Sequence, residues 1–386
     1  MNAFSTSIAW RLTLARACAW ALLVAGWVGI GSLALLFAPS IEFAVAMVAF
    51  WLLGLGAAAS FATRGGMRRV TRALALGLVA ALTGCSLWST VNGGGLAMLL
   101  LALVGWAALT ALASGVVRSL RLMQSAPPSP PVAAATLGAL SAGLVLGDPG
   151  DAGGLAVRLA IFVLAVAIVL VKLQARIEAR PRAPGCRAGL FDCSLPAWPA
   201  GAWRDPLQWP MLLAGLAMLP LMAALPLMAA WCSARGIAPQ VLVLLHLAAM
   251  FGPALLLQTW ITRWSLSTLA TVCGALLAVG AACAAWCPAP IDLLGLSLTH
   301  GAAWSLAWSG QLWAPARRGR QGSSPLRAAA GYALLTLAFG FLVEQVGARG
   351  VAAVHIALGL GAVVAGLLVL VGPGVRAAMA RRHADR

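Results

Sequence analysis

Apolar runs of about twenty residues recur along the whole chain, separated by short segments that hold its charges, prolines and glycine clusters. A membrane-spanning helix needs roughly 20 mostly apolar residues. Charged residues make up 9% of the sequence, against about 25% in ordinary soluble domains, so no soluble fold has enough interior for this much apolar surface. The pattern predicts an all-α, polytopic membrane protein.

Twelve of these runs have the length of a transmembrane helix. We expect the first six spans near 17–37, 41–62, 73–91, 96–117, 132–147 and 155–172, and the second six near 208–231, 239–260, 266–284, 291–314, 328–345 and 351–372. The first run is longer than the apolar core of a signal peptide, so we expect an uncleaved span.

The spans divide into two halves around one long polar segment. We predict an N-terminal six-helix bundle at 1–172, a cytoplasmic linker rich in Pro and Arg at 173–207, and a C-terminal six-helix bundle at 208–386. Two such halves resemble the architecture of the major facilitator superfamily.

The basic residues predict the orientation of the spans. With the N-terminus inside, the inner segments hold 23 of the 26 Lys and Arg residues, and only Arg158, Arg235 and Arg349 lie outside. Because positively charged segments stay in the cytoplasm, both termini are predicted to be cytoplasmic, in a bacterial-type inner membrane. The net charge of +17 is spread between apolar runs, which argues against a folded nucleic-acid surface.

Two further classes of function are disfavoured by the motifs. The eight cysteines show neither a CxxC pair nor zinc-ligand spacing. No nucleotide-binding loop, catalytic triad or redox-cofactor motif is visible, so we expect neither enzyme activity nor a resident cofactor.

The strongest candidate site lies on the seventh and eighth spans. Met218 and Met222 on one, and His246 and Met250 on the other, are each spaced i, i+4, which places each pair on one helix face. An antiparallel arrangement about Gly236 brings Met222 level with His246 and Met218 level with Met250. Thioether and neutral imidazole ligands suit Cu(I) rather than Mg²⁺ or Ca²⁺. Alternatively, the Met side chains fill gaps in the core and the His side chain bonds a neighbour.

The segment 218–222 together with HLAAMFGP at 246–253 resembles the CcoA-like, copper-importing branch of the major facilitator superfamily. That branch carries MxxxM on its seventh span and HxxxM, followed by Phe and Pro, on its eighth. The resemblance implies that Met218, Met222, His246 and Met250 bind copper during uptake, and that the copper serves assembly of a cbb-type cytochrome oxidase, with oxidase-assembly proteins as partners.

The chain also departs from that branch. Ala248 and Ala249 precede Met250 where a Gly is common, only Arg263 remains of a richer charged motif, and the first half shows no matching ligands or buried charge.

Other residues extend the candidate site. His300, Trp304 and Trp308 share helical spacing on the tenth span and either line a substrate cavity or pack in the core. Cys283 and Cys287, at the outer end of the ninth span, either pass a soft ion inward or are simply buried thiols.

These patterns favour a carrier that works by alternating access and moves copper across the lipid bilayer. One alternative is a facilitator-type transporter of a small organic solute, with His300, Trp304 and Trp308 in its cavity. A second alternative, prompted by the charge-poor first half, is a membrane assembly factor that transports nothing and docks a partner protein.

Overall fold

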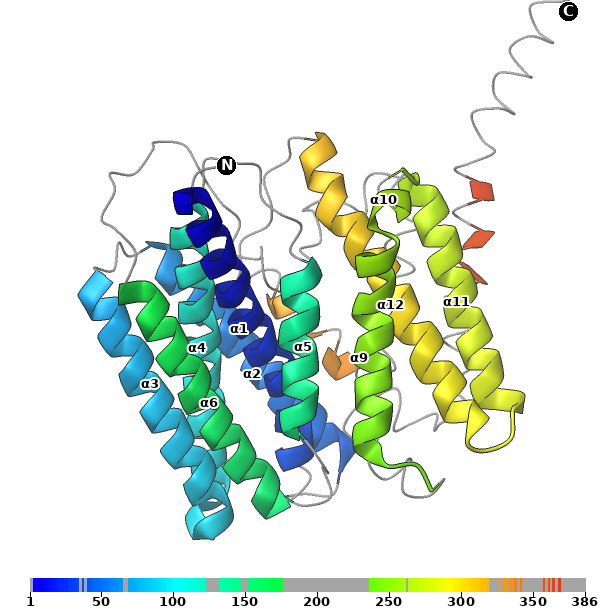
Figure 1. The fold of residues 1–386 in the computed structure, drawn as a ribbon. Coiled ribbons are helices and arrows are strands. Elements are labelled where there is room, and N and C mark those ends of the chain that lie inside the picture. Colours follow the sequence, from blue (N-terminus) through cyan, green and yellow to red (C-terminus); the bar gives the residue numbers. More distant parts are fainter. Residues whose placement is uncertain are drawn as a thin grey trace, which may run out of the picture. The chain divides into compact units, whose positions relative to one another are not determined.

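A computed structural model of the chain describes residues 3–34, 40–64, 69–122, 132–146, 152–175, 236–261 and 263–318, with residue 37 and short helical pieces between 326 and 368. Every regular element within these residues is helical, which confirms the all-α fold class (Figure 1). The elements are α1 (Ala3–Ala34), α2 (Ile41–Arg64), α3 (Arg69–Ser89), the π-helical turn η1 (Thr90–Gly94), α4 (Gly95–Leu122), α5 (Val132–Leu146), α6 (Ala152–Ala175), α9 (Pro239–Leu256), α10 (Gln258–Ile261), α11 (Leu266–Trp286) and α12 (Ile291–Arg318).

Several of these helices are long and apolar enough to cross a membrane. Among the described residues the qualifying stretches are Ala9–Ala34, Glu42–Ser60, Val70–Val117, Gly153–Ala175 and Ser267–Trp286, and the third of them contains both α3 and α4. The chain is therefore a multi-pass membrane protein. The full count of twelve spans stays a prediction, because the seventh span lies outside the described residues and the last two are described only in part.

The first helix departs from its expected extent. We predicted a span over 17–37, which leaves Arg11 and Arg16 in the inner segment before it, whereas α1 begins at Ala3. Both arginines therefore lie inside a helix, and the apolar stretch begins at Ala9. The start was predicted too late because polar residues interrupt the apolar run without ending the helix. The helix makes its backbone hydrogen bonds internally, whatever the polarity of its side chains.

The chain divides into two compact units. One comprises Met1–Ala197, Ala223–Leu247 and Ser323–Glu344, and the other comprises Trp198–Met222, Ala248–Gly322 and Gln345–Arg386. The predicted domains 1–172 and 208–386 and the linker 173–207 stay predictions, because residues 176–235 lie outside the described part of the chain.

In the first unit, α1 packs against α2, α4, α5 and α6. Gly26 permits a close approach: a Cβ added there would lie 2.7 Å from Cζ2 of Trp51 on α2 and 2.9 Å from Nε1 of Trp106 on α4. The indole N–H of Trp106 donates to the carbonyl oxygen of Leu22 at 2.8 Å. Since a buried indole N–H needs a partner, this bond fixes α4 against α1.

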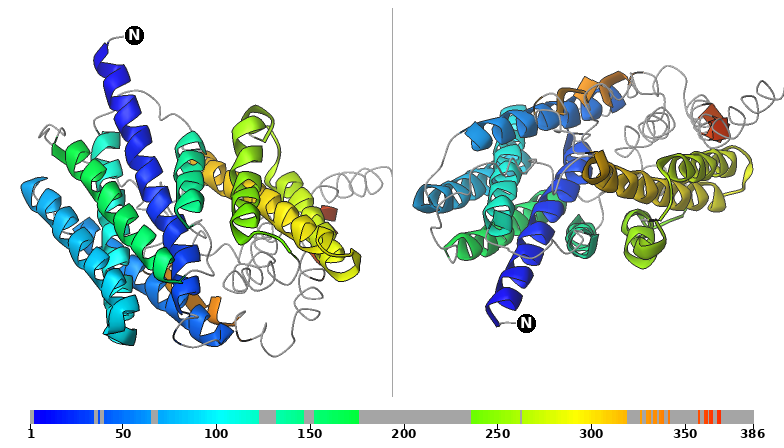
Figure 2. Two further views of the ribbon diagram at one scale, coloured as in Figure 1. Left: turned by 60° about the horizontal axis from the view of Figure 1, so that its bottom comes forward. Right: turned by 90° about the horizontal axis from the view of Figure 1, so that it is seen from above.

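The helices α3 and α4 form a tight hairpin, with α6 alongside (Figure 2). Gly93 and Gly95 adopt positive φ values of 96° and 59° at the turn, a conformation that favours glycine. At the opposite end, Nη1 of Arg72 donates to Oγ of Ser119 at 2.6 Å and to the carbonyl oxygen of Gly115 at 3.3 Å. These charge-assisted bonds tie the start of α3 to the last turns of α4.

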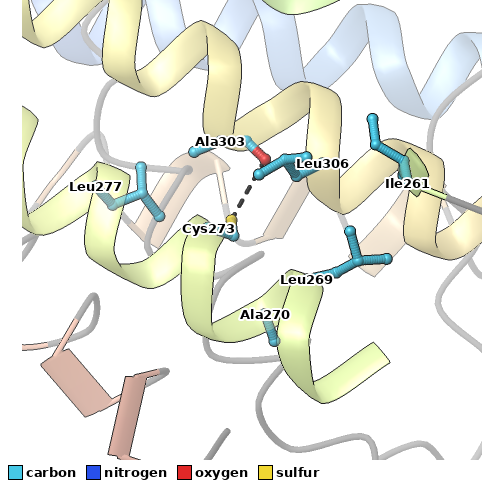
Figure 3. Close-up of a cluster of buried hydrophobic side chains, with 7 residues drawn as sticks. All are labelled: Ile261, Leu269, Ala270, Cys273, Leu277, Ala303 and Leu306. Carbon is cyan, nitrogen blue, oxygen red and sulfur yellow. Dashed lines mark hydrogen bonds between the residues drawn. The ribbon is translucent and has the colours of Figure 1, made fainter. Parts of the chain in front are cut away.

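The second unit contains a hairpin of α11 and α12. Oγ of Ser265 accepts a bond from the backbone N–H of Thr268 at 3.0 Å and so caps the start of α11. A buried cluster joins the hairpin to α10, and the thiol of Cys273 donates to the carbonyl oxygen of Ala303 at 3.3 Å within it (Figure 3). The members of the cluster are Ile261, Leu269, Ala270, Cys273, Leu277, Ala303 and Leu306.

Candidate substrate site

The eighth predicted span corresponds to α9, which carries two of the four expected ligands. His246 is 4% exposed and Met250 is 7% exposed. α9 is one helix from Pro239 to Leu256, so these two residues lie one turn apart on the same face. Both side chains are therefore turned into protein rather than toward lipid, as a ligand role requires.

The other two expected ligands, Met218 and Met222, lie outside the described residues. Their position level with Met250 and His246 stays a prediction.

The second half of α9 is joined to α12 beside a proline. Pro253 lies within α9, where its ring removes a backbone donor and disturbs the preceding turn. The backbone N–H of the next residue, Ala254, donates to Oγ of Ser305 on α12 at 3.0 Å. Three residues earlier, Phe251 meets Trp304 edge to face, with ring centroids 5.3 Å apart. The irregular part of α9 is thus supported from α12 by a hydroxyl and an indole ring.

Of the predicted cavity residues, His300 is 1% exposed and Trp304 is half-buried against Phe251. Trp308 lies within α12, and its side chain is not among those described. Trp304 therefore packs on α9, while the burial of His300 makes it a polar group in the interior of the second unit.

The first unit holds a buried charge that the sequence analysis did not predict. Arg16 is 3% exposed and lies seven residues inside the apolar stretch Ala9–Ala34 of α1. The expectation that the first half carries no buried charge is therefore wrong. The missing signal was helix length: once α1 is known to begin at Ala3, Arg16 becomes an ionisable residue within a span, and such residues are commonly functional.

Carboxylates are scarce in the half that contains this arginine. The sequence from 1 to 172 contains three of them, Glu42, Asp148 and Asp151. Glu42 lies in the first turn of α2, and the two aspartates follow α5 in the sequence. Basic charge therefore outweighs acidic charge in this half.

No three His, Cys, Asp or Glu side chains gather into a metal-binding group among the described residues. Met was the predicted majority ligand, so the expected site does not depend on such a group. It depends on thioethers and on His246.

No family model and no curated protein sequence matches this chain. Solved transporter structures match nearly its whole length. A point mutant of the peptide transporter POT has a TM-score of 0.62 and 14% identity, covering 95% of this chain and 94% of that one. The xylose transporter XylE from E. coli gives a TM-score of 0.61 and 13% identity, over 96% and 98% of the two chains. A point mutant of the nucleoside transporter NupG has a TM-score of 0.61 and 12% identity, covering 94% of this chain and 99% of that one.

The chain has the major facilitator fold. Coverage of both chains above nine-tenths means that the likeness extends over both halves and not over one bundle alone. At such low identity the likeness concerns the fold, and the substrates of those transporters do not transfer with it.

Proposed function

We propose that this chain is a membrane carrier that works by alternating access. The proposal is supported by the multi-pass apolar helices and by a fold that solved transporters share over their full length. In this fold the substrate site lies near the middle of the membrane, between two bundles that expose it to each side in turn.

Cu(I) is the substrate that we propose first. The observation that supports it is the burial of both His246 and Met250, one turn apart on α9. A neutral imidazole is a metal ligand of borderline softness, and a thioether one turn away adds a soft ligand. Met218 and Met222 complete a four-ligand set in which no ligand must lose a proton to bind. Uptake for assembly of a copper-dependent oxidase is the role that the sequence resemblance implies.

A small polar organic solute is the second candidate. It is favoured by the burial of His300, a polar side chain of α12. The similar structures are transporters of nucleosides, xylose and peptides. In this proposal His300 recognises the solute by hydrogen bonding, while Trp304 and Trp308 contribute aromatic surface.

Copper uptake in cells separates the candidates. We would measure accumulation of radioactive copper in cells that express the intact chain or a variant, His246→Ala, Met250→Ala or Met222→Ala. Loss of one ligand from a small metal site should lower uptake about tenfold or more. Leu255→Ala is the matched control, because Leu255 lies on the same helix but is 42% exposed.

Equal copper uptake with the intact chain and all three ligand variants would reject Cu(I) as the substrate. Flux of sugars, nucleosides or peptides into vesicles, reduced by His300→Ala, would then support the second candidate. If no solute crosses reconstituted vesicles and a partner protein co-purifies, the carrier proposal fails and the assembly-factor hypothesis gains.

A further inference from the structure

Two cysteines end the helix α11. Cys283 lies in its last turn and Cys287 is the residue that caps it. The backbone N–H of Cys287 donates to the carbonyl oxygen of Cys283 at 2.9 Å. The two α-carbons are therefore held one helical turn apart by the backbone itself, at a spacing where side chains i and i+4 meet.

The two thiols lie against each other and remain accessible. The thiol of Cys287 is near enough to that of Cys283 to interact with it. Both residues are half-buried, and both are free thiols in this structure. The pair thus combines two neighbouring sulfur atoms with partial exposure.

Packing against α12 restricts Cys283. A Cβ added at Gly295 of α12 would lie 2.9 Å from Cβ of Cys283 and 3.1 Å from its Sγ. Only the absence of a side chain at Gly295 lets the cysteine occupy this position. A sulfur held in place before binding loses less conformational freedom when a metal arrives.

We propose that Cys283 and Cys287 form a two-coordinate binding site for Cu(I). Thiolates are soft ligands that select Cu(I), whereas structural zinc sites almost always have four ligands. Among the described residues no third His, Cys, Asp or Glu joins the pair, so the site fits a cation that accepts two ligands. Binding replaces both thiol protons with one cation, releases two protons to solvent and transfers no electron.

The predicted orientation of the spans places this end of α11 outside the cell. The pair would then meet an incoming cation before His246 and Met250 do. This role as an entry site rests on the proposed copper uptake, whereas binding at the pair does not.

The other described cysteines provide controls. Cys273 is buried and donates to Ala303, and Cys18 is also buried. Cys85 on α3 is exposed and has no cysteine one turn away. Cys85 therefore tests whether a single accessible thiol is sufficient to bind Cu(I).

Thiol labelling of the unmodified protein tests the site without any substitution. The full chain, purified in detergent, reduced and kept without oxygen, would be treated with a maleimide before and after one equivalent of Cu(I), and the labelled cysteines identified by mass spectrometry. We expect Cu(I) to slow labelling of Cys283 and Cys287 about tenfold or more and to leave Cys85 unchanged. Unchanged labelling of the pair, or equal slowing at Cys85, would overturn the proposal.

Competition with a coloured Cu(I) chelator then measures stoichiometry. Cys283→Ser and Cys287→Ser should each bind one Cu(I) fewer than the intact chain and Cys85→Ser, with all variants eluting as the same folded species. Binding by both serine variants equal to that of the intact chain rejects the site.

The same labelling experiment separates this site from the proposed function. His246→Ala and Met250→Ala should leave the protection of the cysteine pair intact. Protection without copper uptake by the intact chain would reject the carrier for copper and leave the thiol site standing. Copper uptake by the intact chain without protection of the two cysteines would support the copper carrier and reject the thiol site.

Discussion

At the scale of single residues, Gly26 decides how closely three helices of the first unit approach. The atoms nearest to a Cβ at this position belong to the rings of Trp51 and Trp106, which are 0% and 1% exposed. Rings that are buried this deeply have no free space into which they can move.

We predict that Gly26→Ala destabilises the protein by about 1 to 3 kcal/mol, the usual cost of overpacking a core. Thermal unfolding in detergent measures it. Gly77→Ala is the matched control: Gly77 lies on α3 with no atom within 4 Å of the added Cβ, and alanine favours a helix by up to about 1 kcal/mol. If both variants unfold at the same temperature, the account of Gly26 is wrong.

Arg16 shows why one part of the interior was not predicted from sequence. An arginine just before an apolar run matches the pattern of a basic anchor at the membrane surface, and that pattern holds for most arginines of this chain. Only the three-dimensional arrangement of α1 among its neighbours buries this one. The shared helix face of His246 and Met250 was predictable, because their spacing of four residues places them on one face of any α-helix.

At the scale of elements, most helices of the first half and several of the second were predictable from hydropathy. The expected span 41–62 corresponds to α2 and 266–284 to α11, each within a few residues. The agreement follows from membrane thickness, which sets the length of an apolar run. Helix ends were less predictable, since a helix continues past the apolar run into polar residues, as α12 does to Arg318.

The proline of α9 gives a prediction at this scale. Ser305→Ala removes the acceptor of the Ala254 N–H, and we expect it to lower stability by about 1 to 3 kcal/mol. In a Pro253→Ala background α9 regains the missing backbone N–H donor and can hydrogen-bond regularly. Ser305→Ala should then lower the stability by less than half as much. A thermal double-mutant cycle measures this coupling. Independent, additive effects of the two changes would contradict it.

At the scale of the whole molecule, the unequal distribution of basic residues predicts the topology. A phosphatase that is active only outside the cytoplasm should be inactive when fused after Arg386 and active when inserted at 147–151, between α5 and α6. Green fluorescent protein, which fluoresces only inside, should give the opposite pattern at the same two positions. An active phosphatase after Arg386 would reverse the assigned orientation or change the number of spans.

The all-helical, multi-pass fold was predictable from the sequence, and its chemistry only in part. Alternating apolar runs with inner basic segments constrain the architecture strongly, because a helix satisfies all its backbone hydrogen bonds within one apolar segment of about twenty residues. The predicted copper site depends on a few side chains from distant segments, and spacing along one helix does not show which residues of another helix face it. Met218 and Met222 accordingly remain predicted ligands, while the burial of His246 and Met250 is part of the fold.

The hairpin of α3 and α4 has a consequence for biosynthesis. Its turn at Gly93, its bond from Arg72 to Ser119 and its close contact between Thr83 and Gly105 are all internal to residues 69–122. The two helices can therefore pair through these contacts as soon as both have left the ribosome, before the later helices are made. We expect them to leave the translocon together, as a preassembled helical pair on which the later helix α6 is laid.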